Sequence, residues 1–382
     1  DFLQENAILG SRVTYTRATI NGVYWGLYTM VEQLDKTFLT HRFGNKTGNL
    51  YKALPRFSGW EPAGGATLEY LGNQANDYDS IYVLKTNEIV NDWSGFVNLL
   101  DKINNSTASE FWDSLEVVMN TDSYIKAWAA MRLFVNGDAY PFLGNNYYMY
   151  ENPADNKFQW IAWDFNLGIG SARSGMTIPQ AENSSVLFIT SNGGARPLAT
   201  RMLDDPVYYN RYLGYVCQFA QSILDTAYLS TKIDSIANMI RTDLYADPNK
   251  FYSNVAFEEN LVFDILGFPG LKPFMANRSV VVMNELQSLG CPIITAIAPA
   301  PPIREVHVYP NPFSDYATIN LQSLNDPYSW KMYNALGQLV QSRDNIHDQR
   351  LTILKGNLTE GIYLYQIYSK DRLVLSGKVV VE

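Results

Sequence analysis

Three polar side chains in one stretch of the chain, Asp138, Asn146 and Asp164, are of the types that phosphoryl transfer uses. That reaction needs a carboxylate near the acceptor hydroxyl and oxygen ligands for the Mg²⁺ that bridges the phosphates. A carboxylate, an amide and a second carboxylate occur here in the order in which protein kinases carry them. The gap from Asp138 to Asn146 is longer than in the usual kinase catalytic loop. The stretch is therefore a candidate site for this chemistry.

The same three residues also have a purely structural interpretation. Asp138 would cap a helix end, Asn146 would start a strand and Asp164 would begin a turn, which are ordinary positions for Asp and Asn. Spacing alone favours this structural interpretation. The candidate site therefore depends on whether the fold brings the three side chains together.

Two lysines are candidates for contacts with a nucleotide. Lys52 and Lys85 lie on strand-like segments, from which a lysine could reach phosphate groups, although a solvated strand lysine is the commoner case. Glu32 and Glu69 lie on or beside strands and could orient such a lysine. Arg196 could hold a phosphate or pair with an acid.

The elements that would position these residues are predicted from hydrophobic periodicity. A helix is predicted from Thr121, because apolar side chains recur there at helical spacing. The helix breaks at 136–138, and two strand-like runs follow at 146–150 and 158–163, joined by a polar turn at 152–157. Polar side chains at the ends of such packed elements can be held rigidly.

The rest of the first 290 residues mixes strands and helices. Val13–Ile20 and Tyr24–Val31 are strand-like and are joined by Asn21-Gly22, a strong hairpin signal. Further short strands are predicted at Leu68–Tyr70 and 82–86. We expect loops at 59–67 and 171–194, and helices at 36–42, 93–104, 198–203, 207–220, 230–241 and 271–289.

Composition narrows the class of protein. The 382 residues carry a net charge of −9, which excludes the basic footprint of a nucleic-acid-binding protein. No apolar run is long enough to predict a transmembrane helix, and no secretory signal is visible at the start. The scattered histidines exclude a His-based triad or metal cluster. Cys217 and Cys291 are far apart, and we expect two separate buried thiols rather than a disulfide.

The C-terminal part has a different pattern. A Pro-rich run at 299–302 is typical of a semi-rigid linker. From about Arg304, seven short strand-like runs separated by turn residues predict a small β-sandwich. Its ionisable residues lie singly or in turns, so no catalytic set is predicted there.

Two family resemblances follow from motifs in these regions. Residues 1 to about 290 resemble the CotH family, spore-coat-type proteins with an atypical protein-kinase-like fold. The motifs that carry this resemblance are NGVYWGLY at 21–28, GNLYK at 48–52, NNYYMY at 145–150, WDFN at 163–166 and RPL at 196–198. The last 80 or so residues resemble the C-terminal sorting domain of type IX secretion, through VYPNPF at 308–313, YNALGQ at 333–338, GIY at 361–363 and KVVV at 378–381.

These resemblances imply an α+β fold class: an atypical protein-kinase-like domain followed by a small all-β sandwich. The expected domains are a kinase-like domain at 1–291, in which the chain begins after the family's usual start, a Pro-rich linker at 292–304 and a sorting domain at 305–382. The type IX secretion machinery is the implied partner, and the implied location is secreted or on the outer-membrane surface of a Gram-negative bacterium.

The CotH resemblance also implies an activity. It is phosphorylation of Ser or Thr in an exported protein substrate, with ATP and Mg²⁺ (or Mn²⁺) as cofactors. Asp138 would be the catalytic base, Asn146 and Asp164 the metal ligands, and Lys52 and Lys85 the phosphate contacts.

One departure from the family pattern keeps alternatives open. Asn166 stands where many relatives carry a second carboxylate. A non-catalytic surface or adhesion protein on a kinase-like scaffold is therefore the alternative function. A carbohydrate-binding module is a third possibility, which rests only on the aromatic content of 14%.

Overall fold

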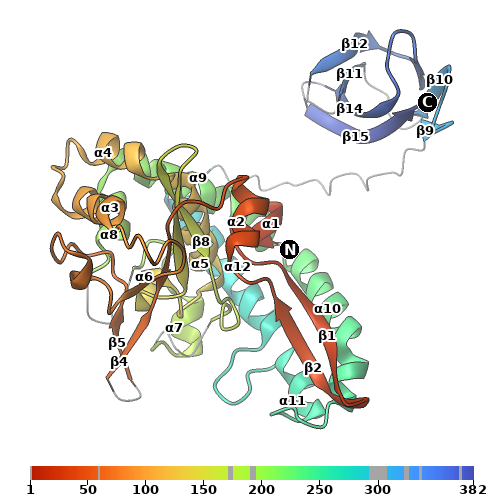
Figure 1. The fold of residues 1–382 in the computed structure, drawn as a ribbon. Coiled ribbons are helices and arrows are strands. Elements are labelled where there is room, and N and C mark those ends of the chain that lie inside the picture. The colour runs from red at the N-terminus through yellow and green to blue at the C-terminus, as the bar shows by residue number, and fades with distance from the viewer. Residues whose placement is uncertain are drawn as a thin grey trace. The chain divides into compact units, whose positions relative to one another are not determined.

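The structure is a computed structural model that describes residues 2–58, 61–170, 175–189, 195–291, 308–321, 327–334, 338–369 and 372–382. Contacts divide the chain into two compact units, Asp1–Ile293 and Ile294–Glu382, here called the N-terminal and C-terminal units (Figure 1). The linker predicted at 292–304 lies outside the described residues. No described helix combines the length and the apolar character that crossing a membrane requires.

A four-stranded antiparallel sheet forms the centre of the N-terminal unit, in the order β6-β3-β7-β8. Its strands are β3 (Leu50–Ala53), β6 (Tyr82–Leu84), β7 (Tyr147–Asn152) and β8 (Lys157–Ala162). The hairpin predicted at 146–163 is confirmed, because β7 and β8 pair antiparallel from the Tyr147–Ala162 pair to the Asn152–Lys157 pair. Nearly every residue of β7 and β8 is buried, so helices cover both faces of this hairpin.

The two faces of the sheet pack against different helices. One face packs against α3 (Ser94–Asn105) and α5 (Thr121–Phe134) in the large core, where Tyr147 stacks on Trp160 with ring centroids 4.0 Å apart. The other face carries Tyr148 and Ile161 and packs against α2. Helix α2 (Lys36–Phe43) is capped by Asp35, which accepts hydrogen bonds from the backbone N–H groups of Thr37 and Phe38.

The N-terminal hairpin is confirmed, with its second strand beginning one residue earlier than predicted. Strands β1 (Val13–Ile20) and β2 (Val23–Val31) pair antiparallel. They are joined by Asn21 and Gly22, whose φ angles of 50° and 81° are those of the two-residue turn that suits a twisted hairpin. The hairpin extends along α10 (Thr226–Ala246) (Figure 1).

Every predicted helix is confirmed. Helices α2, α3 and α5 lie beside the sheet, and the others follow in the second half of the N-terminal unit: α8 (Pro197–Asp204), α9 (Pro206–Ile223), α10 and α12 (Leu271–Ser288). Helices α9 and α12 both pack against α5 and so support the candidate stretch. The remaining helices of the described residues are the short elements α1 (Phe2–Glu5), η1 (Ala75–Asp77), α4 (Phe111–Val118), α6 (Tyr140–Leu143), α7 (Ile178–Glu182) and α11 (Asn254–Asn260).

Three predictions of local structure were wrong. Leu68–Tyr70 is not a strand, because Leu68 has a φ of 62° and its backbone N–H donates to the hydroxyl of Tyr82 at 3.1 Å. The loop expected at 59–67 contains β5 (Glu61–Gly65), which pairs with β4 (Pro55–Ser58). Helix α7 interrupts the loop expected at 171–194. In the first two cases a tertiary contact or a pairing partner overrides weak local preference, whereas α7 begins with a local capping box of Thr177 and Gln180 that the prediction missed.

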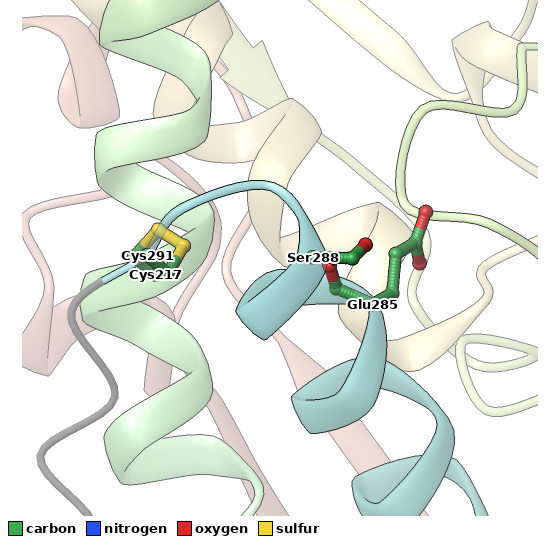
Figure 2. The surroundings of a disulfide bond; sticks show 4 residues. All are labelled: Cys217, Glu285, Ser288 and Cys291. Atoms are coloured by element: carbon green, nitrogen blue, oxygen red, sulfur yellow. A yellow bond between two sulfur atoms is a disulfide. The ribbon is translucent and has the colours of Figure 1, made fainter.

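The expectation of two separate thiols is also wrong, because Cys217 and Cys291 form a disulfide across a sequence separation of 74. Figure 2 shows Cys217 on α9 bonded to Cys291, which follows the end of α12. The packing of α9 against α12 brings the two Cα atoms to 6.0 Å, a distance that suits a disulfide. The helix packing was not visible in the sequence, so the pairing was not either.

The C-terminal unit confirms the all-β prediction. Two antiparallel sheets, in the orders β13-β10-β9 and β12-β11-β14-β15, share one hydrophobic core. In β11 (Tyr328–Tyr333), inward and outward side chains alternate strictly. The other strands are β9 (Val308–Tyr309), β10 (Tyr316–Asn320), β12 (Leu339–Ile346), β13 (Arg350–Leu354), β14 (Gly361–Ser369) and β15 (Arg372–Val381).

Candidate functional site

Asp138 lies in a tight, buried turn between α5 and α6, which we call the Asp138 turn (residues 135–139). Helix α5 ends at Phe134 and is followed by Val135, whose left-handed conformation has a φ of 56°. The side-chain oxygen of Asn136 then accepts the backbone N–H of Asp138 at 3.1 Å. Asp138 is only 7% exposed, and Asn145 Nδ2 donates to its Oδ1 at 3.4 Å. Hydrogen bonds therefore fix both the backbone and the carboxylate of Asp138.

Asn146 is in direct contact with the Asp138 turn. Its Nδ2 donates to the backbone carbonyl of Asp138 at 2.6 Å, and its own φ is 60°. Because this bond fixes the amide by its nitrogen, the amide oxygen is turned away from the carbonyl, and it has no hydrogen-bond partner among the described residues. An oxygen in that state suits a ligand for a hard cation.

Asp164 lies at the same end of the β7–β8 hairpin. The backbone N–H of Trp163 donates to the carbonyl of Asn146 at 3.2 Å, so the chain reaches Asp164 one residue beyond this pair. Asp164 is exposed and has a φ of 56°. We call residues 163–166 the Asp164 turn. The structure thus brings the three predicted residues to the hairpin end that lies opposite the 152–157 turn.

The two lysines lie at unequal distances from this end. Lys52 on β3 pairs with Tyr148 on β7, and its Nζ lies 5.8 Å from the centroid of the Tyr148 ring. Tyr148 is two residues along the chain from Asn146, which bonds to Trp163 at the end of the hairpin. Lys85 is exposed, and its backbone N–H donates to the carbonyl of Leu50 at 2.7 Å, so it lies further along the sheet. The geometry therefore favours Lys52 over Lys85.

Neither predicted acidic partner reaches a lysine among the described residues. Glu32 pairs with Arg12 at 2.6 Å and Arg42 at 3.0 Å. Glu69 accepts a hydrogen bond from Thr67 Oγ1 at 2.7 Å. The orientation of a catalytic lysine by either glutamate is therefore absent from the part of the chain that the structure describes.

Sequence reasoning missed two asparagines beside Asp138. Asn136 Nδ2 and Asn145 Oδ1 are buried and have no hydrogen-bond partner among the described residues. Buried polar atoms are normally paired, so unpaired ones at a candidate site suggest room for a bound polar group or water. The sequence did contain a signal, since Asn-Gly-Asp and Asn-Asn place amides directly beside the candidate residues.

The donor set fits a hard divalent cation. Carboxylate and amide oxygens are the ligands that Mg²⁺ takes, and Mg²⁺ usually keeps several waters and uses only one or two carboxylates. Asn146 Oδ1 and the Asp164 carboxylate would be such ligands, with unpaired buried polar atoms close by. Within the described ranges, no three His, Cys, Asp or Glu residues gather into a metal cluster. A cation here would therefore be bound by few protein ligands.

Comparison with known proteins shows the family of the N-terminal unit. Residues 1–263 match the model of the CotH kinase protein family. The chain belongs to the CotH family. A CotH relative, the inner spore coat protein H of Bacillus subtilis (strain 168), is 22% identical over 251 residues, and the match covers 65% of each chain. The chain thus spans about 65% of the length of this CotH protein.

The C-terminal unit carries a second family match. Residues 307–382 match the secretion system C-terminal sorting domain. Both resemblances found in the sequence are therefore confirmed, and this CotH-family chain carries the tail of a type IX secretion substrate. The tail supports a secreted or cell-surface location and handling by that secretion system.

Proposed function

We propose that this CotH-family protein is a kinase that transfers the γ-phosphoryl group of ATP to Ser or Thr hydroxyls of an exported protein substrate. The observation that carries the proposal is the position of Asp138, Asn146 and Asp164 at one end of the β7–β8 hairpin. Their order, with two strands between the amide and the second carboxylate, is the order in protein kinases. An atypical kinase-like fold for the N-terminal unit is part of this proposal.

Each residue would have a distinct role. The oxygen of the Ser or Thr hydroxyl would bond to the γ-phosphorus as ADP leaves, and Asp138 would accept the proton of that hydroxyl. Asn146 Oδ1 and the Asp164 carboxylate would bind the divalent cation, Mg²⁺ or Mn²⁺, which neutralises phosphate charge when bound. Lys52 would contact a phosphate oxygen, and Lys85 is the weaker candidate for that contact because it lies further from the hairpin end.

A second candidate function is a non-catalytic surface or adhesion protein on a kinase-like scaffold. Asn166 favours it, because the family pattern would place a second carboxylate at this exposed position. The location that the sorting domain supports suits both functions. The two differ in one measurable respect, which is whether phosphate is transferred.

Radiolabelled transfer separates the two functions. The full-length protein is incubated with γ-³²P-ATP, Mg²⁺ or Mn²⁺ and casein as a generic Ser/Thr substrate. We expect label on the protein or on casein from the wild type, and its loss in Asp164→Ala. Absence of transfer by the wild type with either metal, or equal transfer by Asp164→Ala, would overturn the kinase proposal and leave the surface-protein function.

A further inference from the structure

Arg278 on α12 is fully buried and bonds to the end of α5, immediately before the Asp138 turn. Its Nη2 donates to the carbonyl of Arg132 at 3.0 Å, and its Nε donates to the carbonyl of Leu133 at 3.4 Å. Its Nη1 donates to backbone carbonyls in the 182–184 segment. Every described hydrogen-bond partner of this guanidinium is a backbone carbonyl, so Arg278 caps the last turn of α5.

Arg196 also donates hydrogen bonds to backbone carbonyls, on the other side of the Asp138 turn. It is 2% exposed, its Nε donates to the carbonyl of Tyr140 at 2.8 Å, and its Nη2 donates to the carbonyl of Phe142. Tyr140 and Phe142 belong to α6, which follows the Asp138 turn directly. Two buried guanidinium groups from distant parts of the chain therefore bond to the backbone on either side of one short turn.

The turn between them needs such support. Val135 is buried and has a φ of 56°, a conformation that a β-branched residue rarely adopts. An unfavourable backbone conformation of this kind persists only where the surroundings determine it. Burial also lowers the pKa of Arg278 to about 9 and lowers the pKa of Arg196, so both charges are kept at a cost. Hydrogen bonds to several backbone carbonyls compensate each buried guanidinium.

We infer that Arg196 and Arg278 are positioning residues, which fix the two ends of the Asp138 turn so that the Asp138 carboxylate and the Asn146 amide face the reacting groups. The inference rests on the proposed kinase function. It assigns Arg196 a task that the sequence did not suggest, since its guanidinium is directed at α6 carbonyls. Both side chains are buried and their described hydrogen bonds go to backbone carbonyls, so both would act through the backbone on either side of the turn.

The test uses Arg196→Lys and Arg278→Lys, which keep the positive charge and lose the forked donor geometry. Arg201→Lys is the matched control, because Arg201 caps the end of α3 in the same way, donating to the carbonyls of Ile103 at 2.7 Å and Ser106 at 2.5 Å. Two quantities are measured on the full-length protein: kcat and KM for ATP with casein, and hydrogen–deuterium exchange of peptides that cover 135–146.

We expect Arg196→Lys and Arg278→Lys to lower kcat by about 100-fold at unchanged KM for ATP, the effect of a small misplacement of a catalytic group. Exchange within 135–146 should rise roughly tenfold, which corresponds to the loss of about one charged hydrogen bond. Arg201→Lys should change neither. If Arg196 and Arg278 only stabilised the fold, all three variants would have lower melting temperatures, and none would lower kcat at unchanged KM.

Each outcome decides the inference. If the two variants behave as Arg201→Lys in both measurements, the positioning role is wrong. If the wild type transfers no phosphate, the kinase proposal fails by itself. In that case, faster hydrogen–deuterium exchange at 135–146 in Arg196→Lys and Arg278→Lys, but not in Arg201→Lys, still supports the conclusion that the two arginines fix the turn. Unchanged exchange rejects that conclusion. Should a Lys variant fail to fold, Arg196→Gln or Arg278→Gln, which keeps an amide donor, takes its place.

Discussion

The Asp138 turn and the Asp164 turn carry the two carboxylates of the candidate site, yet they are built differently. Asp138 is 7% exposed, accepts a hydrogen bond from Asn145 and lies between α5 and α6, whose backbone carbonyls accept hydrogen bonds from buried arginines. Asp164 is exposed, and the contact that places it is the backbone bond between Trp163 and Asn146. One carboxylate is fixed by the fold, and the other is open to solvent.

This difference suits the two roles in the proposed reaction. A general base must be held within hydrogen-bond reach of one hydroxyl, so a fixed position is an advantage. A ligand of Mg²⁺ must approach an ion that keeps its water, so an exposed carboxylate on a turn is sufficient. We therefore expect substitutions in the Asp138 turn to affect both stability and rate, and substitutions in the Asp164 turn to affect rate alone.

The largest effect is expected from Asp164→Ala. Loss of a cation ligand should lower kcat/KM by about 1000-fold, since a metal ion supplies several kcal/mol to such reactions. The free energy of unfolding should stay within about 0.5 kcal/mol, because the residue is exposed. Asp155→Ala, at the opposite end of the same hairpin, is the control and should keep full activity. Equal losses in both variants would contradict a specific role for Asp164.

Removal of the disulfide tests the comparison between the Asp138 and Asp164 turns through the free energy of unfolding and the local exchange rates. It joins α9 to the residue that follows α12, and α12 carries Arg278. The double variant Cys217→Ser/Cys291→Ser should lower the free energy of unfolding by about 4 kcal/mol, from the loop closed across 74 residues. Chemical denaturation under oxidising conditions measures this loss. Hydrogen–deuterium exchange should rise more at the Asp138 turn than at the Asp164 turn. The reverse order would contradict the view that the fold fixes the Asp138 turn more firmly.

The sequence predicted elements whose signals are local. The hairpin at 13–31 was correct because Asn21 and Gly22 both accept positive φ angles, a preference that needs no tertiary contact. The β7–β8 hairpin was correct because its apolar runs and polar turn occur in one segment. The order of Asp138, Asn146 and Asp164 was visible for the same reason.

What the sequence did not show depends on contacts between distant segments. Leu68 was assigned to a strand, but the hydroxyl of Tyr82 takes its N–H. The disulfide requires the packing of two helices, and the hydrogen bonds of Arg196 and Arg278 join residues that are 54 to 146 positions apart in the sequence. An arginine is ordinarily interpreted as exposed, so no single-sequence pattern shows that Arg196, just before α8, and Arg278, within α12, are buried.

Substitutions of Asp138 should separate chemistry from structure. Asp138→Asn keeps the size of the side chain and should lower kcat by about 100-fold, as expected for loss of a general base. Asp138→Ala should in addition lower the free energy of unfolding by about 1–3 kcal/mol, because it leaves Asn145 Nδ2 buried without its acceptor. Thermal denaturation and steady-state kinetics measure the two effects. A stable Asp138→Ala variant would remove the contrast with Asp164→Ala.

The smallest effect is expected from Asn166→Asp, which restores the carboxylate that the family pattern suggests. Asn166 is exposed beside Asp164, so a second carboxylate would add charge to the cation site without disturbing the core. Mn²⁺ affinity, measured by calorimetry, should rise by about fivefold, the size of an interaction of ~1 kcal/mol at an exposed site. Asn156→Asp is the matched control, because Asn156 is exposed, has a φ of 56° and lies in the opposite turn of the hairpin. A gain in both variants would show a general charge effect, whereas a gain in Asn166→Asp alone would place the cation at the Asp164 turn.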